Sequence, residues 1–496
     1  MFNNLLQGLV TVFSNPSVFV LMLFGVVSGI TIGALPGLTS TMAMAVLLPV
    51  TFGMEPDLSF ALLLSVYCGA IYGGSITAIL INTPGTPSAA ATTFDGYPLA
   101  MKGKAGKALA TSTIASSLGG VISVLLLSTI SPILAKFTLR FAAPEYFALA
   151  VFGLSIIASI SNKNIIKGLM AGFFGLIIAS VGLDPISAIP RFTFGRTELL
   201  SGVAFIPLMV GLFALPQCFV EMETIFKKKE KLEGVQSELI TFKEFLSISP
   251  TIIKSALMGA FIGAIPGAGG DIAAFTAYNE AKRVAKKDEN FGEGEIKGIA
   301  APEAANNAST GGAMIPLLSL AVPGDSNTAV LLGGLIIMGL QPGPLLFTQQ
   351  SELVNSIFAI MLLANITMGI VGLLGIKFFI KALNVPKQII VPIVLTLSVV
   401  GSYSMNNSIF DVFITIAFGI IGYLMLKADV IVSPIVLAVI LGPMAETNFR
   451  RSLIMFDGNL SFLYTRPITI VFLVIATFTI VTSVFHQSLF KRGVAK

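Results

Sequence analysis

Two stretches of sequence, 230 residues apart, decide the fold: Gly25–Ser40 reads GVVSGITIGALPGLTS, and Ser255–Gly270 reads SALMGAFIGAIPGAGG. Six of their sixteen positions are identical, including both copies of a Gly-Ala-X-Pro-Gly run. A second Pro-Gly break follows each stretch, at Asn82–Gly85 and at Val322–Asp325. Proline and glycine are common in membrane helices, which explains one kink but not two matched pairs in the same order. The sequence therefore predicts a duplicated unit with two broken helices or re-entrant hairpins in each half.

The composition is that of a membrane protein. Of the 496 residues, 55% are hydrophobic and only 11% are charged, and the mean hydropathy is +0.91. Soluble domains average about 25% charged residues, so this chain could not cover a water-facing surface. Apolar runs such as Ile165–Leu183 and Ile357–Ile380 suit helices that cross a bilayer core of about 30 Å. They are too long for barrel strands of roughly 10 residues, so we expect an all-α polytopic membrane protein with about 10–14 membrane segments.

Several functional classes are excluded by what the sequence lacks. The net charge of +5 comes from short basic runs between apolar segments, which indicates topology and no nucleic-acid partner. No G-x-x-x-x-G-K-[ST] run is present, so ATP binding in a P-loop is not expected. Cys68 and Cys218 are isolated, and His486 is the single histidine, so neither a disulfide framework nor histidine chemistry is predicted. The N-terminus lacks the basic region of a signal peptide, since no Lys or Arg precedes Lys102. We predict that the chain is not an enzyme and has no organic cofactor.

The loops that follow equivalent breaks differ in charge. After the first break, Gly53–Asp57 in half one is acidic, whereas Ala281–Lys297 in half two is rich in Lys and Arg. After the second break the pattern is exchanged: Lys102–Lys107 is basic, and Gln341–Glu352 has no basic residue. Because basic loops face the cytoplasm, equivalent loops should lie on opposite sides of the membrane. This predicts two inverted repeats, as in many secondary transporters, with duplication without inversion as the alternative.

The chain is predicted to divide into three parts. Residues 1–220 hold the first repeat and the membrane helices that follow it, and residues 251–496 hold the second repeat and the C-terminal membrane helices. Between them, residues 221–250 form a polar linker that contains the basic run Lys227–Lys231. We expect this linker and the basic C-terminal tail to lie in the cytoplasm.

The broken helices are the predicted substrate site. A break inside a membrane span frees backbone groups that must be buried in protein or face water. Each new helix N-terminus also attracts anions, and Ser, Thr, Asp and Asn near the breaks suit N-caps. The alternative is that these caps only complete kinked structural helices. The residues predicted to bind substrate are Gly37, Thr39, Ser40, Thr41, Asn82, Thr83, Gly85, Thr86, Gly267, Gly269, Gly270, Gly324, Ser326 and Asn327.

Polar residues beside the breaks of the second repeat are the predicted cation site. Asp271, Glu303, Asn306 and Asp325 lie in or next to apolar spans, where carboxylates are costly and usually functional. Their oxygens suit a proton relay or a hard cation, with Na⁺ expected at Asp271 and Asp325, and the sequence leaves Na⁺ and H⁺ open. Asp95 precedes a Gly-Tyr-Pro run, and a role as an interface cap is an open alternative for it.

Glycines recur at every fourth position before the first break of each repeat. Gly25, Gly29, Gly33 and Gly37 form one such series. This spacing places them on one helix face, where backbones can approach closely. We expect this face to pack against another helix, with ligand contact as the alternative.

These motifs resemble one known family. The stretches GALPGLTSTMAMAVLLPVTF, YGGSITAILINTPGTPSAAATTFDGYPLAMKGKAGKAL, GAIPGAGGDIAAFTAYNEAKR and LSLAVPGDSNTAVLLGGL resemble the large TctA-type subunit of tripartite tricarboxylate transporters. RFTFGRTELLSGV and LGPMAETNFRRSL are similar to the same family. The likeness runs in order from about residue 15 to 467.

The resemblance implies a multi-pass permease of the bacterial inner membrane with two partners. These are a small four-helix membrane subunit and a periplasmic solute-binding protein that captures the substrate. The implied substrates are citrate and other small carboxylates, taken up by symport with a cation. The break motifs contain no Arg or Lys, so we expect no arginine clamp and a need for the capture protein. Whether the chain forms a homo-oligomer is left open.

Three other classes compete with this interpretation. A large permease subunit of the TRAP type would share the general plan, although the motifs fit the tricarboxylate family better. A membrane-embedded enzyme or assembly factor would need a catalytic set that the sequence lacks. A passive channel would not need paired anion and cation sites. Two broken hairpin units favour an elevator-like slide over a rocking motion.

Overall fold

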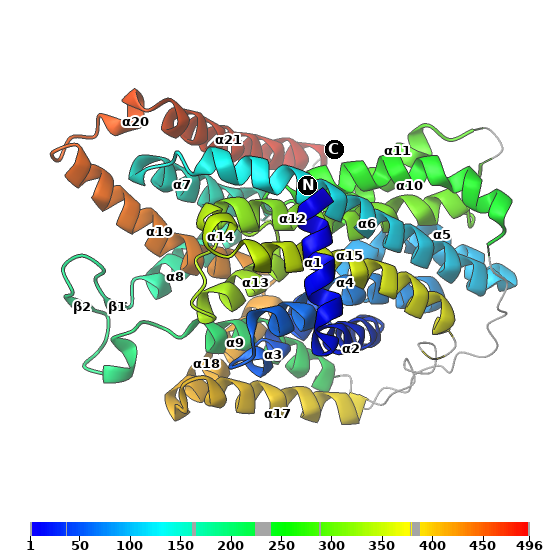
Figure 1. The fold of residues 1–496 in the computed structure, drawn as a ribbon, viewed down its shortest axis with the longest axis horizontal. Helices are drawn as coiled ribbons and strands as arrows, with labels where there is room; N and C mark the ends of the chain where they lie inside the picture. The colour runs from blue at the N-terminus through cyan, green and yellow to red at the C-terminus, as the bar shows by residue number, and fades with distance from the viewer. Residues whose placement is uncertain are drawn as a thin grey trace. The chain divides into compact units, whose positions relative to one another are not determined.

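The structure, a computed structural model, describes residues 2–35, 37–160, 165–223, 240–286, 289–376, 378 and 387–494. The basic run Lys227–Lys231, with most of the predicted linker, lies outside the described residues. Within the described ranges the chain is helical apart from loops and one short antiparallel pair, β1 (Gly182–Leu183) and β2 (Pro190–Arg191) (Figure 1). The prediction of an all-α protein is therefore confirmed.

Seven helices in the described part of the chain are long and apolar enough to cross a membrane, by length and composition. They are Pro16–Gly33, Pro56–Ile81, Thr93–Thr138, Phe205–Glu223, Phe242–Gly263, Ser351–Leu374 and Ile409–Lys427. Shorter apolar helices accompany them, among them Ile165–Ala179 and Ser326–Ile337. The chain is thus a multi-pass membrane protein.

The helices form two compact units, and each unit is assembled from two separate stretches. Unit 1 comprises Met1–Ala135 and Gln217–Leu397, and unit 2 comprises Lys136–Pro216 and Ser398–Lys496. Both pairs of breaks lie in unit 1. The predicted parts 1–220, 221–250 and 251–496 describe the order of the repeats along the chain, and this division remains a prediction.

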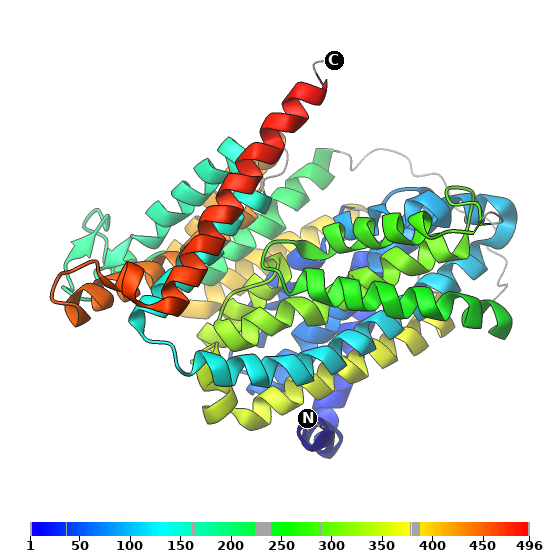
Figure 2. The same cartoon turned by 90° about the horizontal axis from the view of Figure 1, so that it is seen from above.

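Unit 1 contains the two repeats as similar series of helices. The first series is α2 (Pro16–Gly33), α3 (Ser40–Leu47), α4 (Pro56–Ile81), η2 (Pro87–Ala90) and α5 (Thr93–Leu99). The second series is α10 (Phe242–Gly263), α11 (Gly269–Arg283), α12 (Ile296–Leu320) and α13 (Ser326–Ile337), and its first three helices run beside one another in green in Figure 2. The remaining elements are α1 (Phe2–Ser14), η1 (Pro49–Thr51), η3 (Ala100–Lys104), α6 (Ala105–Thr138), α14 (Pro344–Gln349) and α15 (Ser351–Leu374). The unit ends at Leu397, within α17 (Lys387–Asn406).

Unit 2 is a separate helical bundle. Its elements are α7 (Ala143–Ile160), α8 (Ile165–Ala179), β1, β2, η4 (Thr197–Leu199), α18 (Ile409–Lys427), α19 (Ser433–Met455), α20 (Phe462–Thr465) and α21 (Pro467–Val494). α9 (Phe205–Glu223) belongs to unit 2 up to Pro216, and its last residues belong to unit 1. α19 and α21 both pack against α7, and α21 is the red helix of Figure 2. Arg466, just before α21, forms an ion pair with Glu145 of α7 at 3.0 Å.

The glycine series serves close packing, and it does so identically in the two repeats. Gly29 of α2 lies against the backbone of Val66 in α4, and Gly259 of α10 lies against the backbone of Ala305 in α12. The two contacts are equivalent, because the residues in repeat two follow those in repeat one by the same number of positions that separates the break motifs of the two repeats. A side chain at either glycine would meet the facing backbone, which explains why the sequence uses glycine there. The duplication is therefore confirmed.

The equivalent helices α4 and α12 run antiparallel. Ser75 of α4 is hydrogen-bonded to Glu303 of α12, and Cys68 of α4 lies against Thr310 of α12. From the first of these contacts to the second, the chain moves seven residues toward the N-terminus in α4 and seven residues toward the C-terminus in α12. Repeats whose equivalent helices run in opposite directions are inverted, so the prediction from the loop charges is confirmed.

The loops have the arrangement that inversion requires. Lys102, after the second break of repeat one, donates to the backbone carbonyl of Glu293, after the first break of repeat two, at 2.5 Å. Asp57, after the first break of repeat one, interacts electrostatically with Glu352, after the second break of repeat two. The two basic loops therefore lie together, and so do the two loops that have no basic residue.

Candidate functional site

The first break of repeat one meets the second break of repeat two at what we call the α3–α13 junction. Thr41 in the first turn of α3 donates to Oδ1 of Asn327 in the first turn of α13 at 3.0 Å. Asp325 is the N-cap of α13, and its Oδ1 accepts the backbone N–H of Thr328 at 2.8 Å. The junction thus joins two helix N-termini from opposite halves of the chain.

A tyrosine that sequence analysis missed completes this junction. The hydroxyl of Tyr67, which is fully buried in α4, donates to Oδ2 of Asp325 at 2.7 Å. The amide of Asn327 donates to the same oxygen at 3.2 Å. Tyr67 precedes Asp325 by 258 residues, and no local motif marks it.

The second break of repeat one meets the first break of repeat two at the η2–α11 junction. A Cβ atom on Gly270 would lie 2.7 Å from Oδ1 of Asn306, 2.9 Å from Oγ of Ser309 and 3.5 Å from Cβ of Ser88. Asn306 is fully buried, and neither atom of its side-chain amide has a hydrogen-bond partner in the described residues. A buried amide without partners is costly, so it marks a place where a ligand or water belongs.

The two junctions are related by the symmetry of the repeats and are connected to each other. The N–H of Gly267 in the first break of repeat two donates to the carbonyl of Gly324 in the second break at 2.7 Å. Asp271 at the start of α11 also interacts electrostatically with Asp325. The structure therefore brings Thr41, Gly270, Asp271, Asn306, Asp325 and Asn327 into one region of unit 1.

Not every predicted substrate residue points into this region. Asn82 and Thr83 are exposed, and Asn82 ends α4 in a left-handed conformation with φ of 52°. Ala321 ends α12 in the same way, with φ of 58°, so the position serves to turn the chain. The Thr83 hydroxyl donates to the carbonyl of Ile81 at 3.2 Å.

The other predicted residues have structural contacts near the breaks. Gly85 and Thr86 are buried, and the N–H of Gly85 donates to the carbonyl of Gly74 at 3.0 Å. Gly37, with φ of 90°, lies against the carboxylate of Glu221, in the last part of α9, which belongs to unit 1. Ser40 is buried in the first turn of α3, and Ser326 and Gly269 are half-buried at the starts of their helices.

The four predicted anion-binding N-termini are not equally open. Thr39 caps α3 by accepting the N–H of Met42 at 3.1 Å, and the Asp325 carboxylate caps α13. η2 is a four-residue turn, too short to present an aligned helix dipole. α11 begins after Ala268, and no side-chain cap is found there in the described chain. The N-terminus of α11, next to Asn306, is therefore the one without an N-cap side chain, although the Asp271 carboxylate accepts the backbone N–H groups of Asp271 and Ile272.

Glu303 lies on α12, three residues before Asn306, in a separate polar environment. Its side chain is fully buried, and it accepts hydrogen bonds from four hydroxyl groups, which we call the Glu303 cage. Sequence analysis found Glu303 but not its partners, which come from α4, from α6 and from Thr92, the N-cap of α5. The described ranges contain no group of three or more His, Cys, Asp or Glu side chains placed to hold a metal ion. The Na⁺ site at Asp271 and Asp325 remains a prediction.

Asp95 is a structural clamp between the two halves. Its Oδ1 accepts the backbone N–H groups of Gly292, Gly294 and Glu295 at 2.8–2.9 Å, and its Oδ2 accepts the hydroxyl of Tyr278 at 2.9 Å. These bonds fix the loop before α12 to α5. Asp95 therefore has the interface-capping role that was one of its two predicted alternatives.

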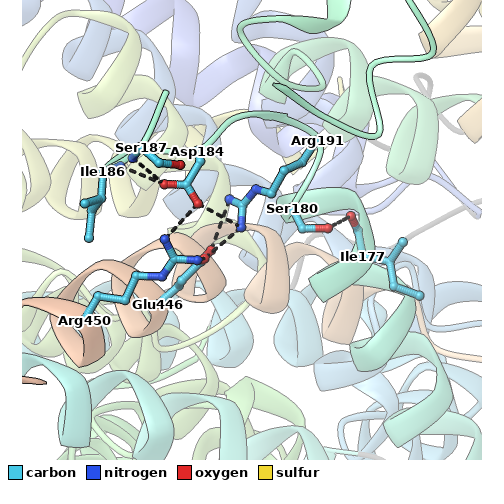
Figure 3. Close-up of polar contacts among 8 residues, drawn as sticks. All are labelled: Ile177, Ser180, Asp184, Ile186, Ser187, Arg191, Glu446 and Arg450. Carbon is cyan, nitrogen blue, oxygen red and sulfur yellow. Dashed lines mark hydrogen bonds and ion pairs between the residues drawn. The ribbon is translucent and has the colours of Figure 1, made fainter. Parts of the chain in front are cut away.

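Unit 2 contains an ion-pair network that joins the two motifs outside the breaks (Figure 3). Arg191 of β2 pairs with Glu446 of α19 at 2.7 Å, and Arg450 of α19 pairs with Asp184 at 2.8 Å. Asp184 also accepts the backbone N–H groups of Ser187 and Ile186, and these bonds, with Arg450, hold the pKa of its carboxyl well below the usual range. Two arginines balance two carboxylates, so the network fixes the loop and leaves no net charge for an anion.

Inverted repeats whose broken helices converge on polar residues are the architecture of secondary transporters. This chain belongs to the tripartite tricarboxylate transporter TctA family, which it matches over residues 19–437. It is therefore a membrane component of such a transporter, and this membership favours transport over an enzymatic function. The family implies partner subunits and a periplasmic binding protein.

Two curated relatives come from Agrobacterium vitis. The chain is 36% identical over 468 residues to the "Uncharacterized 52.8 kDa protein in TAR-I ttuC' 3'region", covering 94% of this chain and 93% of the relative. It is also 36% identical over 210 residues to the "Uncharacterized protein in TAR-II ttuC' 3'region", covering 42% of this chain and 87% of that relative. No solved structure matches the chain.

Proposed function

We propose that this chain is the permease subunit that takes up small organic carboxylates, of the citrate type, across the bacterial inner membrane by symport with a cation. The observation that carries the proposal is the partnerless amide of Asn306 beside Gly270, in the first turn of α11, where no N-cap side chain covers the N–H groups of Gly269 and Gly270. Free N–H groups at a helix start and a side-chain NH₂ are donors for carboxylate oxygens. The Asn306 carbonyl oxygen can accept from a hydroxyl group of the substrate.

The acidic residues at the same place explain why a cation is needed. Asp271 and Asp325 put negative charge beside the proposed anion site. A substrate carboxylate would be repelled by them unless a cation or protons neutralised the site. Anion and cation then bind better together than apart, which is the thermodynamic basis of coupled transport.

The proposed partners follow from the weak anion site. The junctions hold the substrate through N–H groups and neutral side chains, without the bidentate Arg contacts that give strong carboxylate binding. A periplasmic solute-binding protein would supply the affinity and deliver the substrate, and a small four-helix membrane subunit would complete the transporter.

Uptake of radiolabelled citrate and of a panel of other carboxylates tests the proposal. Cells would express the chain with its small subunit and binding protein, and Na⁺ and pH gradients would be imposed separately. Asn306→Leu is expected to reduce uptake by about tenfold or more, because a hydrogen bond to a charged group contributes roughly 1.5–3 kcal/mol. Asn355→Leu is the matched control, since Asn355 already has a partner in Gln7 at 3.2 Å. Absence of uptake of any carboxylate, with all subunits present in the membrane and periplasm, would contradict the proposal.

A further inference from the structure

Glu303 has an unusual environment for a carboxylate in a membrane helix. Its Oε1 accepts from Ser75 of α4 at 2.5 Å and from Thr92 at the start of α5. Its Oε2 accepts from Ser112 and Ser116 of α6 at 3.0 and 2.7 Å. Each oxygen therefore has two hydroxyl partners, all contributed by the first half of the chain.

The Glu303 cage supplies hydrogen bonds but no charge. Within the described ranges no Lys, Arg or His forms an ion pair with Glu303. A carboxylate that is buried in a membrane protein without a counter-ion is costly, and such residues usually belong to ion pathways or proton relays. A purely structural clamp could be built from neutral side chains at lower cost. The environment therefore indicates that a cation binds at Glu303 during the functional cycle.

The geometry distinguishes a proton from a metal cation. Hard metal ions need several oxygen ligands around an open position, as in sites of six or more ligands for Ca²⁺. The cage hydroxyls instead lie at hydrogen-bond distance from the carboxylate itself, so they occupy the positions that a metal would take. A proton needs no cavity. When the carboxyl is protonated, its O–H donates to one hydroxyl oxygen, and that hydroxyl turns its own hydrogen away.

We propose that Glu303 is the proton-binding site that couples substrate movement to a proton gradient, an inference that rests on the proposed function. In the outward-facing state a proton from the external water binds the Glu303 carboxylate and gives a neutral carboxyl group. In the inward-facing state the same proton leaves to the cytoplasmic water. One proton is carried for each Glu303 and cycle, and no bond to the substrate is made or broken.

Glu303 is the group that exchanges a proton in this proposal, because the neighbouring titratable groups interact with other residues. Tyr72 of α4 interacts electrostatically with Glu303, and its hydroxyl is hydrogen-bonded to Thr113 at 2.6 Å. The charged groups of the other elements packed on α12 have contacts elsewhere. These are Asp95 of α5 with Tyr278, Lys107 of α6 with Glu244 of α10, Lys254 of α10 with Glu280 of α11, Asp271 of α11 with Asp325, and Asp325 of α13 with Tyr67.

The position of Glu303 connects the proton to the substrate site. Glu303 and Asn306 are three residues apart on α12, and side chains with this spacing lie on one face of a helix. Thr92 of the cage follows Ser88 of the η2–α11 junction by four residues. A change in the charge of Glu303 therefore acts on the same two segments that face Gly270.

Reconstituted transporter of all three subunits in liposomes tests this proposal with citrate as the probe. Two assays are compared: citrate counterflow without any ion gradient, and net citrate uptake driven by an inward proton gradient with Na⁺ equal on both sides. Glu303→Gln mimics the permanently neutral carboxyl. It is expected to retain counterflow within about twofold and to lose proton-driven net uptake by about tenfold or more, because the proton can no longer leave.

Ser116→Ala is the second variant, because it removes one cage hydroxyl and keeps the carboxyl group. It is expected to retain proton-driven uptake with a shifted pH midpoint, and this result stands if Glu303→Gln does not insert. Proton-driven uptake of wild-type size in Glu303→Gln, or an unmoved pH midpoint in Ser116→Ala, would overturn the proton site. Wild-type uptake that follows a Na⁺ gradient at clamped pH would overturn it as well. Failure of the wild type to exchange any carboxylate would instead remove the proposed function itself.

Discussion

Asp95→Ala tests the clamp that holds the two halves of unit 1 together at their basic loops. The substitution removes the acceptor of three backbone N–H groups and of the Tyr278 hydroxyl. The N–H groups lie in a partly exposed loop, so water replaces part of each bond, and a loss of about 1 kcal/mol per bond is reasonable. The expected cost is therefore about 4 kcal/mol. Asp95→Asn keeps one acceptor oxygen for the N–H groups and should cost about 1.5 kcal/mol, mainly for the lost charge.

Thermal unfolding in detergent with a thiol-reactive dye is the suitable assay. The chain has no Trp, but Cys68 and Cys218 are buried and become reactive when the fold opens. At about 2 °C per kcal/mol for a large cooperative unit, we expect Tm to fall by about 8 °C for Asp95→Ala and about 3 °C for Asp95→Asn. Glu293→Ala in the same loop is the matched control, since its side chain is exposed. Equal Tm values for Asp95→Ala and this control would refute the clamp.

Three other predictions address packing, coupling and the network of unit 2. Gly29→Ala would place a Cβ atom 2.6 Å from the facing backbone oxygen of Val66, so it should lower the stability by about 1–3 kcal/mol in the same Tm assay. Gly334→Ala is the control, because its Cβ would meet only side chains at 3.3 Å or more and its Tm should be nearly unchanged. Asp271→Ala and Asp325→Ala should abolish or uncouple citrate uptake while leaving membrane insertion intact, and normal uptake in both variants would remove the cation role of these residues. Because the pKa of Asp184 is lowered, the folded loop gains stability above the ordinary Asp value near 4 and loses it only at lower pH. The rate of tryptic cleavage of that loop, divided by the rate for an unstructured peptide at the same pH, should therefore be constant from about pH 5 to 8. Asp184→Ala should speed that cleavage at every pH, and an unchanged cleavage rate would show that the network does not hold the loop.

The architecture could be predicted from sequence because helix breaks and loop charges are each determined by a few neighbouring residues. Pro-Gly breaks must interrupt helices wherever they occur, and their order repeated at a constant offset. Lys and Arg residues in the loops indicate on which side of the membrane each loop lies. This signal was sufficient to predict the inversion, which the pairs Ser75–Glu303 and Cys68–Thr310 confirm.

The partners of the site residues could not be predicted, because they depend on helix register across the fold. Glu303 was found from its charge, but Ser112 and Ser116 look like many other hydroxyl residues in membrane helices until α6 is placed beside α12. Nearness to a break was also not sufficient for Asn82, whose backbone turns the chain while its side chain is exposed. Asp325 was predicted to bind a cation, and the structure adds that it caps its own helix.

The most direct test of the central claim is protection of a single cysteine at the open end of α11. Ala268→Cys places a thiol at the N-cap of that helix, where the backbone has ordinary helical angles and the residue is half-buried. Cys68 and Cys218 are buried, so a maleimide should label the new thiol selectively, and Ser201→Cys on an exposed loop serves as the control. If citrate or another carboxylate occupies this site, labelling of Ala268→Cys in the assembled transporter should slow by about tenfold at saturation while the control stays constant. Equal labelling rates with and without a carboxylate that the transporter demonstrably takes up would place the substrate elsewhere and contradict the account.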